Sequence, residues 1–298
     1  MNIKCIKTIA PLIISVILFF ASPSLAEVYS YSQDKSVIGF TRAHIVRKNE
    51  SLIEIARKFD LGFNEITEAN PNLDPFVPGT GSNIIVPTSW ILPDAESYDG
   101  IIINLSEMRL YYFFNQKGSK LIRTFPIGIG SQGNNTPEGT FSIVEKIVNP
   151  SWHVPESIRK EHPELKRVEP PGPENPLGTH ALRLSLGSIL IHGTHRPYGV
   201  GRKVSHGCIR LYPEDIPKLF QLVPVKTKVT IVRQPLKVGI VDDQIYIEVH
   251  KDTVLEINYF DEAVKLLRRK NLYDTIDKDK MISALKEKKG FPVNISRQ

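Results

Sequence analysis

The stretch Ser205-His206-Gly207-Cys208-Ile209-Arg210 contains one of only two cysteines in the 298-residue chain. The other, Cys5, lies near the N-terminus, in a segment with the features of a secretory signal. The expected mature protein therefore carries a single thiol into an oxidising compartment, where no partner exists for an intramolecular disulfide. Cys208 is then either an inert buried thiol or a reactive nucleophile. The polar residues and the glycine beside it favour the nucleophile.

The first 26 residues combine Lys4 and Lys7, an apolar stretch, and small residues at Ser24 and Ala26 that suit cleavage. Cleavage removes two lysines and so lowers the formal net charge of +6 by 2. The alternative is an uncleaved anchor helix, for which the apolar stretch is short. No later apolar run is long enough to span a bilayer, and no basic, aromatic-interleaved tract suggests nucleic acid. We therefore expect an exported protein with no stable membrane span after signal cleavage.

Two histidines can activate the thiol. An ordinary thiol has a pKa of about 8.5 and is mostly protonated at neutral pH, so a nearby imidazole is needed to take its proton. His192 ends a short apolar run, whereas His206 stands two residues before Cys208. The Gly193 carbonyl can fix the tautomer of His192, and the amides of Gly207 and Cys208 are candidates for an oxyanion hole. We favour His192 as the base and a loop-orienting role for His206.

Other chemistry fits the sequence less well. A four-coordinate zinc site could draw on His180, His192, His195, His206 and Cys208, but their spacing matches no standard zinc pattern. A dithiol redox role lacks the necessary Cys-x-x-Cys pair. We therefore assign no metal and no cofactor.

The region over 98–233 is expected to be mainly β, a sandwich or barrel. Short β-rich runs recur from residue 100 to residue 232, and Gly100–Leu105 and Arg109–Phe114 form an expected hairpin. The proline-rich and charged stretch Pro150–Gly178 is too long for a turn and is expected to be a lid or substrate-binding loop. Residues 234–298 form an expected α/β extension in which we identify no chemical constellation.

A separate βααβ module is expected over 43–88. Ser51 and Glu54 form a capping box for its first helix, and Asn64 is expected to cap a second helix that ends near Ala69. The stretch Thr88–Gly100, with Pro93 and several polar residues, is expected to be a linker.

Taken together, these motifs resemble a known family. Ile191-His192-Gly193-Thr194 followed by Ser205–Leu211 resembles the L,D-transpeptidases, with their YkuD-type catalytic domain. Thr136–Phe141 matches that family's turn-and-strand signature, and Asn149–Trp152 and Asn175–Gly178 match a loop of its periplasmic ErfK/YbiS-like branch. The βααβ module resembles a LysM module, which binds glycans such as peptidoglycan.

The resemblance implies a role for each matching residue. Cys208 would be the nucleophile and His192 the proton donor and acceptor. Gly207, His206, Ser205 and Gly193 would shape the site. Arg210, which stands where many members have Asn, and Trp152 would contact the substrate. The implied organisation is a signal over 1–26, a LysM-like module over 43–88, a catalytic domain over 98–233, and the extension over 234–298.

The implied reaction takes place on peptidoglycan in the periplasm. Cys208 would attack the third-residue carbonyl of a tetrapeptide stem, release D-Ala, and pass the acyl group to an amine. That amine would belong to a second stem, giving a 3→3 cross-link, or to an outer-membrane lipoprotein. With water as acceptor the protein would be an L,D-carboxypeptidase. If it had no catalytic activity, it would be a wall-binding LysM protein. The resemblance also implies acylation by carbapenems.

Overall fold

The computed structural model describes residues 27–32 and 34–297, so the expected signal and Cys5 lie outside the described residues. Within that part of the chain, no helix has the length and apolar character needed to cross a bilayer. The strands are β1 Val28–Ser30, β2 Val37–Gly39, β3 Arg42–Ile45, β4 Asn83–Val86, β5 Ser89–Ile91, β6 Gly100–Asn104, β7 Arg109–Gln116, β8 Ser119–Pro126, β9 Ile129–Gly130, β10 Gly139–Val148, β11 Trp152–His153, β12 Val168–Glu169, β13 His180–Leu184, β14 Leu190–His192, β15 Lys203–Ser205, β16 Ile209–Arg210, β17 Lys228–Val232, β18 Leu236–Val241, β19 Gln244–Val249 and β20 Val293–Asn294. The helices are α1 Leu52–Lys58, α2 Phe63–Ala69, α3 Glu156–Glu161, α4 Ile216–Leu222, α5 Tyr259–Arg269 and α6 Lys278–Glu287, with a short 3-10 turn at Pro197–Gly199.

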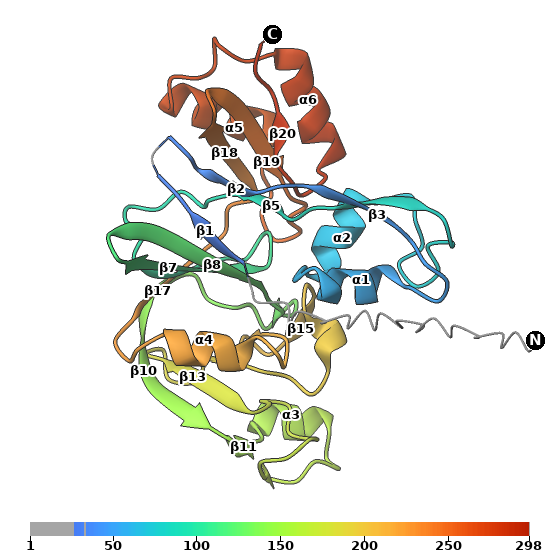
Figure 1. Ribbon diagram of the computed structural model, residues 1–298. Coiled ribbons are helices and arrows are strands. Elements are labelled where there is room, and N and C mark those ends of the chain that lie inside the picture. The colour runs from blue at the N-terminus through green and yellow to red at the C-terminus, as the bar shows by residue number, and fades with distance from the viewer. Residues whose placement is uncertain (1–26, 33, 298) are drawn as a thin grey trace, which may run out of the picture.

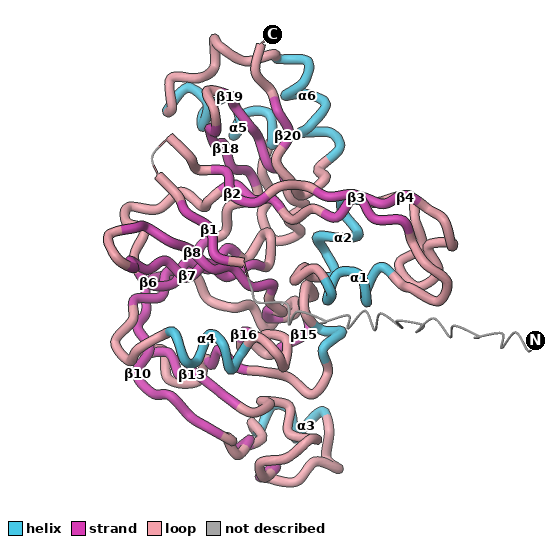
Figure 2. Tube along the Cα trace, viewed as in Figure 1, coloured by secondary structure: helices cyan, strands magenta, loops and turns pink. Residues whose placement is uncertain are grey.

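A curled nine-stranded sheet forms the centre of the molecule, as the expected mainly β fold requires. Its strand order is β1-β8-β7-β6-β17-β10-β13-β14-β16, and Figure 1 shows β10 and β13 running away from β7 and β8 toward the lower end of the molecule. Neighbouring strands are antiparallel except at β6–β17 and β14–β16, which are parallel. Strands and loops dominate the chain trace in Figure 2. The last parallel pair carries the candidate site.

The centre of the sheet is buried on both faces because β6 and β7 alternate between two apolar sets. Ile101 and Ile103 of β6 face a core with Leu110 and Tyr112 of β7. The intervening residue Ile102, with two β7 aromatics, faces a second core. Successive side chains of a strand point to opposite faces, so an unbroken apolar run such as β6 indicates cover on both sides.

The second core is shared with the LysM-like module. Leu52 and Ile55 of α1 and Ile66 of α2 belong to the same apolar cluster as Ile102 and Tyr111 of the large sheet. The structure therefore differs from the expected separate module. The expected linker is also wrong in part, because residues 89–91 form β5, which is fully buried and pairs with β2.

The two helices of the module begin differently. At α1 the expected capping box is confirmed: Ser51 Oγ accepts from the Glu54 amide at 3.2 Å, and Glu54 accepts from the Ser51 amide at 2.9 Å. At α2 the expected cap at Asn64 is wrong, since the N-cap is Gly62 and Asn64 lies inside the helix. Glu65 accepts from the Gly62 amide at 2.7 Å, but glycine offers no side-chain acceptor for the first helical amides.

The extension over 234–298 forms a small three-stranded sheet, β18-β19-β20, covered by α5 and α6. It lies at the top of Figure 1, next to β2 and β5. Its strands and its two helices agree with the expected α/β extension. Asp277 caps α6 by accepting from the amides of Asp279 and Lys280.

A fully buried ion pair joins the LysM-like module to the large sheet. Arg109 of β7 donates to Glu65 of α2 at 2.9 and 2.8 Å, and the two side chains are 0% and 1% exposed. The Arg109 guanidinium also lies 4.1 Å from the ring centroid of Trp90, whose indole N–H donates to Glu65. Removing one partner of such a pair leaves an uncompensated buried charge.

Arg109→Met is therefore expected to lower the free energy of unfolding by about 3–5 kcal/mol, measured by urea denaturation. Arg57→Ala is the matched control. Arg57 also forms an ion pair across this interface, with Glu214, but the side chains of Arg57 and Glu214 are each 40% exposed. An exposed pair contributes at most about 1 kcal/mol. Equal losses in the two variants would contradict the prediction. The double variant Arg109→Met with Glu65→Met should recover part of the loss.

Candidate active site

The end of the main sheet brings His192 and the cysteine loop together. β14 and β16 pair in parallel, with Ile191 opposite Ile209 and His192 opposite Arg210. Ile191 and Ile209 are fully buried in the main core, so His192 and Arg210 belong to the other face. Cys208 directly precedes β16, so this register puts its backbone diagonally opposite His192. Neighbouring strands lie about 4.8 Å apart, which brings the two residues to the same end of the strand pair.

His192 is held as a neutral base. Its side chain is 3% exposed, and its Nδ1 lies 2.6 Å from the carbonyl oxygen of Gly193. A carbonyl only accepts hydrogen bonds, so Nδ1 carries the proton in the neutral ring. Burial, and secondly the positive charge of Arg210, lower the pKa of His192 to about 3. The Leu177 backbone also hydrogen-bonds the ring and, like that of Gly193, acts to raise the pKa of His192. The sequence led us to expect the contact with Gly193.

Cys208 is half-buried, and its resting thiol is protonated. Its Sγ lies 3.7 Å from the carbonyl oxygen of Ser188 in the turn before β14. Burial raises the pKa of the Cys208 thiol, while a hydrogen bond with the Leu190 backbone and the charges of Arg210 and Arg183 act in the opposite direction. Both members of the pair are thus uncharged at neutral pH, rather than a preformed thiolate–imidazolium pair.

Two hydroxyl groups fix the backbone around the thiol. Ser205 Oγ donates to the Cys208 carbonyl at 2.5 Å, and Thr136 Oγ1 donates to the Gly207 carbonyl at 3.0 Å. Because a peptide unit is planar and trans, orienting the Gly207 carbonyl also orients the Cys208 N–H in the opposite direction. Gly207 has a φ of +98°, which few residues other than glycine adopt. From the sequence, Thr136 is recognised only as part of a motif. The structure shows that its hydroxyl orients the backbone next to Cys208.

His206 contacts the lid. Its side chain is exposed, and its Nε2 lies 3.7 Å from a carboxylate oxygen of Glu161 at the end of α3. This contact agrees with a loop-orienting role, which stays a prediction.

The expected lid over 150–178 contains α3 and a small hairpin of β11 and β12. Trp152 is half-buried in this hairpin, opposite Glu169. Asn175 is fully buried and holds the base of the lid, since its Nδ2 donates to the Pro150 carbonyl at 2.9 Å and its Oδ1 accepts from the Leu177 amide at 2.9 Å. Sequence reasoning placed Asn175 in a motif but did not anticipate this structural role.

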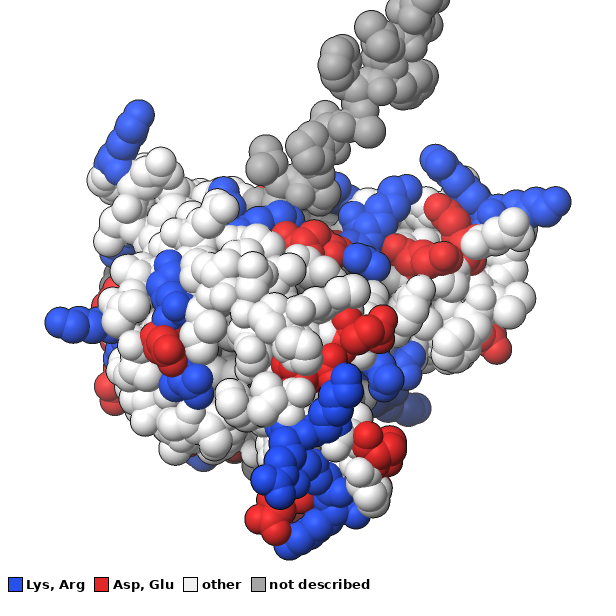
Figure 3. Space-filling model, turned by 90° about the horizontal axis from the view of Figure 1, so that it is seen from below, with Lys and Arg blue, Asp and Glu red and all other residues white. Residues whose placement is uncertain are grey.

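Two side chains close to His192 and Cys208 in the sequence carry buried nitrogens without a hydrogen-bond partner among the described residues. Arg210 is partly exposed, and its buried Nε has no hydrogen-bond partner among the described residues. The Nδ1 of His195, in the loop after His192, is also buried without a partner in that part of the chain. Figure 3 views the molecule from below, the side on which α3 lies in Figure 1, and shows Lys and Arg side chains gathered at one part of this face. An unpartnered guanidinium beside the thiol suits a carboxylate or carbonyl of a substrate.

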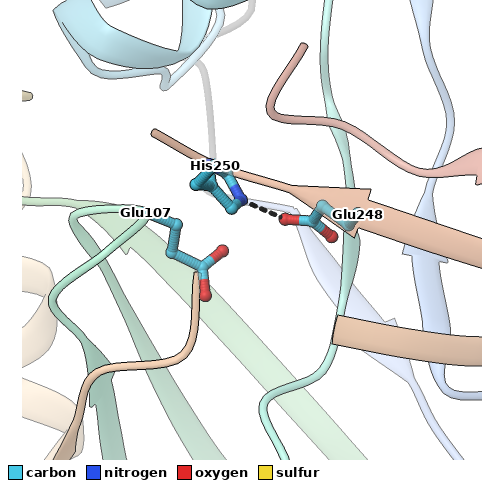
Figure 4. A group of neighbouring side chains, drawn as sticks. All are labelled: Glu107, Glu248 and His250. Atoms are coloured by element: carbon cyan, nitrogen blue, oxygen red, sulfur yellow. Dashed lines mark hydrogen bonds and ion pairs between the residues drawn. The ribbon is translucent and has the colours of Figure 1, made fainter. Parts of the chain in front are cut away.

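The alternative zinc ligands point in different directions. The His180 ring lies 4.6 Å from the Phe220 ring, and His206 contacts Glu161. Among the described residues, the one group of three His, Cys, Asp or Glu side chains that could share an ion is Glu107, Glu248 and His250, which Figure 4 shows. Lys237 already lies between its carboxylates, with Nζ 2.8 Å from Glu107 and 2.9 Å from Glu248. Its ammonium supplies the positive charge that a metal would bring, so we assign no metal there.

Comparison with known families and proteins identifies two domains in the chain. The L,D-transpeptidase catalytic domain model, YkuD, matches residues 98–231, and the LysM domain model matches residues 44–87. The fold and the family matches define an L,D-transpeptidase catalytic domain joined to a LysM domain. The chain belongs to the L,D-transpeptidase family, because it is 34% identical to the probable L,D-transpeptidase ErfK/SrfK of Salmonella typhimurium over 97% of this chain and 98% of that protein.

Two further relatives carry the same name. The probable L,D-transpeptidase YbiS of Escherichia coli K12 is 34% identical over 99% of this chain and 100% of its own length. YcfS of the same organism, also a probable L,D-transpeptidase, is 40% identical over 68% of this chain and 65% of that protein. The solved catalytic domain of the E. faecium L,D-transpeptidase matches 46% of this chain and 99% of its own, at 19% identity and a TM-score of 0.35.

Proposed function

We propose that this L,D-transpeptidase acts on peptidoglycan stem peptides in the periplasm, with Cys208 as nucleophile and His192 as the group that moves the proton. The observation that carries the proposal is the parallel pairing of β14, which ends at the buried His192, with β16, which begins directly after the half-buried Cys208. The expected signal supports export, and the LysM module supports attachment to the wall.

The first acyl transfer begins from the neutral pair. As Sγ attacks the carbonyl carbon of the third stem residue, its proton passes to Nε2 of His192, and the carbonyl electrons move to the oxygen. The amides of Gly207 and Cys208 donate to that oxyanion. Collapse of the intermediate breaks the bond to the fourth residue, and D-Ala leaves after its nitrogen takes the proton from the imidazolium. The acyl group remains on Cys208 as a thioester.

The second acyl transfer reverses these roles. An amine attacks the thioester while His192 accepts its proton, an amide bond forms, and the C–S bond breaks. The thiolate then recovers the proton from the imidazolium. A stem diamino acid as acceptor gives a 3→3 cross-link, a lysine of an outer-membrane lipoprotein attaches that protein to the wall, and water gives a tripeptide.

The remaining residues bind or orient the substrate. Arg210 directs its guanidinium toward a carboxylate or carbonyl of the stem, and Trp152 contacts the stem from the lid. Ser205, His206 and Gly193 hold the loop and the imidazole in place. Carbapenems acylate Cys208 by the same attack on a carbonyl.

The full chain incubated with tetrapeptide muropeptides tests this proposal, with products identified by mass. We expect a cross-linked dimer that has lost one D-Ala. A tripeptide alone would identify an L,D-carboxypeptidase. Attachment of a lysine-terminated peptide, added as a competing acceptor, would identify the lipoprotein reaction. Unchanged tetrapeptide, together with no adduct on Cys208 after exposure to meropenem, would leave only a wall-binding role.

A further inference from the structure

The loop that joins the candidate base to the candidate nucleophile packs against the LysM module. This loop leaves β14 after His192 and returns through β15 to the cysteine. At its middle, the carbonyls of Val200 and Gly201 accept from the amides of Phe63 and Asn64 at 3.2 and 3.3 Å. The first amides of a helix have no partner within the helix. The catalytic loop therefore supplies the acceptors that Gly62, the N-cap of α2, lacks.

The contact is too close for any side chain at the loop glycine. Gly201 is buried with a φ of +76°, and a Cβ added there would lie 2.1 Å from the Phe63 nitrogen. Beside it, the guanidinium of Arg202 lies 3.6 Å from the centroid of the Phe63 ring, a cation–π contact. Backbone and side chains thus fix α2 and the loop against each other.

The remainder of α2 is held by the two other parts of the protein. Glu65, one turn into the helix, binds Arg109 of the main sheet. Glu68 lies 3.4 Å from Nδ1 of His250, which follows β19 of the C-terminal extension. His250 also binds Glu248 at 2.7 Å, as the dashed line in Figure 4 shows. Helix α2 is therefore in contact with the catalytic loop, the main sheet and the extension at the same time.

The extension also contacts the catalytic loop itself. Lys203 of β15 donates to Thr253 Oγ1 at 2.8 Å, so the loop is held on the Gly201 side by the LysM module and at β15 by the extension. These contacts give residues 234–298, for which the sequence suggests no chemistry, a mechanical role beside the active site.

We propose that α2 of the LysM module is a positioning element of the active site: it holds Val200–Arg202, and through that segment sets the geometry of the loop between His192 and Cys208. This proposal rests on the proposed function of those two residues. Wall binding and acyl transfer then occur on one rigid unit, not on two units joined by a flexible linker. Phe63 and Arg202 are positioning residues, since they act through the loop and touch no reacting atom.

Phe63→Ala tests the proposal in the full chain. Acylation of Cys208 by meropenem is followed by intact mass over a concentration series, which separates the maximal rate from the half-saturating concentration. We expect the maximal rate to fall about tenfold, because misplacement of a catalytic group by up to 1 Å can cost as much as 10²-fold, with little change in half-saturation. Phe63→Tyr keeps the ring and should restore the rate. Phe260→Ala removes an exposed aromatic ring from α5 and should leave the rate unchanged.

A second pair of variants tests the backbone contact. Gly201→Ala should slow acylation at least as much as Phe63→Ala does. Gly118→Ala should not, because Gly118 has a similar φ of +81° but no atom within 4 Å of an added Cβ. Wild-type maximal rates in both Phe63→Ala and Gly201→Ala, or no rescue by Phe63→Tyr, would overturn the proposal. A wild-type chain that is never acylated at Cys208 would instead overturn the proposed function, and this inference with it.

Discussion

Cys208→Ala is expected to abolish both the turnover of tetrapeptide stems and the acylation by meropenem, while the protein stays folded. Sγ is the atom that forms the thioester, so its removal leaves nothing to carry the acyl group between donor and acceptor. The thiol is half-buried at the start of a short strand, outside the main apolar core, so its loss opens no large cavity. Turnover is measured from the mass of the products, acylation from the mass of the adduct, and folding from the midpoint of urea denaturation.

Ser188→Ala is the matched control for this variant. It removes one exposed hydroxyl from the residue whose carbonyl lies 3.7 Å from Sγ, and it leaves the thiol in place. We expect wild-type turnover. Retained turnover in Cys208→Ala would mean that the acyl group never passes through this sulfur, and it would remove the proposed mechanism.

The local features of this fold could be predicted because neighbouring residues determine them. The β6–β7 hairpin follows from two β-rich runs and a three-residue turn, and the Ser51–Glu54 capping box needs only residues within one helical turn. The cysteine motif is also continuous, and His192 ends an apolar run. A reader of the sequence can therefore find the site without knowing the topology.

The features that depend on distant contacts could not be predicted. Asn64 is a good cap by composition, yet α2 begins one residue before it because Val200 and Gly201, far along the chain, supply the missing acceptors. Likewise, Ser89–Ile91 lies between Pro87 and Pro93, and only its pairing with β2 and its burial make it a strand. No local pattern encodes either contact.

The buried charged residues of the extension could not be predicted from the sequence for the same reason. Lys237 and Glu248 stand opposite each other on β18 and β19, among apolar residues that form the extension's own core. Alternation predicts that such polar side chains face water. Their face is instead covered by the rest of the protein, where Lys237 reaches Glu107 of the catalytic domain and Glu248 accepts from the Ile91 amide. These ion pairs become apparent only when the extension is seen packed against the rest of the protein.

The protonation states at the site also depend on the fold. A histidine near a cysteine suggests a thiolate–imidazolium pair, but burial and the charge of Arg210 lower the pKa of His192 to about 3, while burial raises the pKa of Cys208. Both shifts favour the uncharged forms. This difference changes the pH dependence that the mechanism predicts.

His192→Ala is expected to slow acylation of Cys208 by meropenem about 10²–10⁴-fold at pH 7, the range typical of a lost general base. In the wild type the imidazole stays unprotonated at every pH above its pKa of about 3. The acylation rate should therefore change little between pH 5 and pH 8. In the variant only the thiolate already present can react, and the raised thiol pKa makes that fraction small. Its rate should rise about tenfold per pH unit over the same range.

The dependence of the acylation rate on pH distinguishes the loss of a general base from misfolding of the variant. As pH approaches the thiol pKa, the His192→Ala rate should converge toward the wild-type rate, which a misfolded protein would not do. His162→Ala removes an exposed imidazole from the lid and should keep both the wild-type rate and the flat profile. If His192→Ala itself showed a flat profile at near wild-type rate, the proton would have to leave through another group. His206, directed toward Glu161 in this structure, would then have to turn inward to receive it.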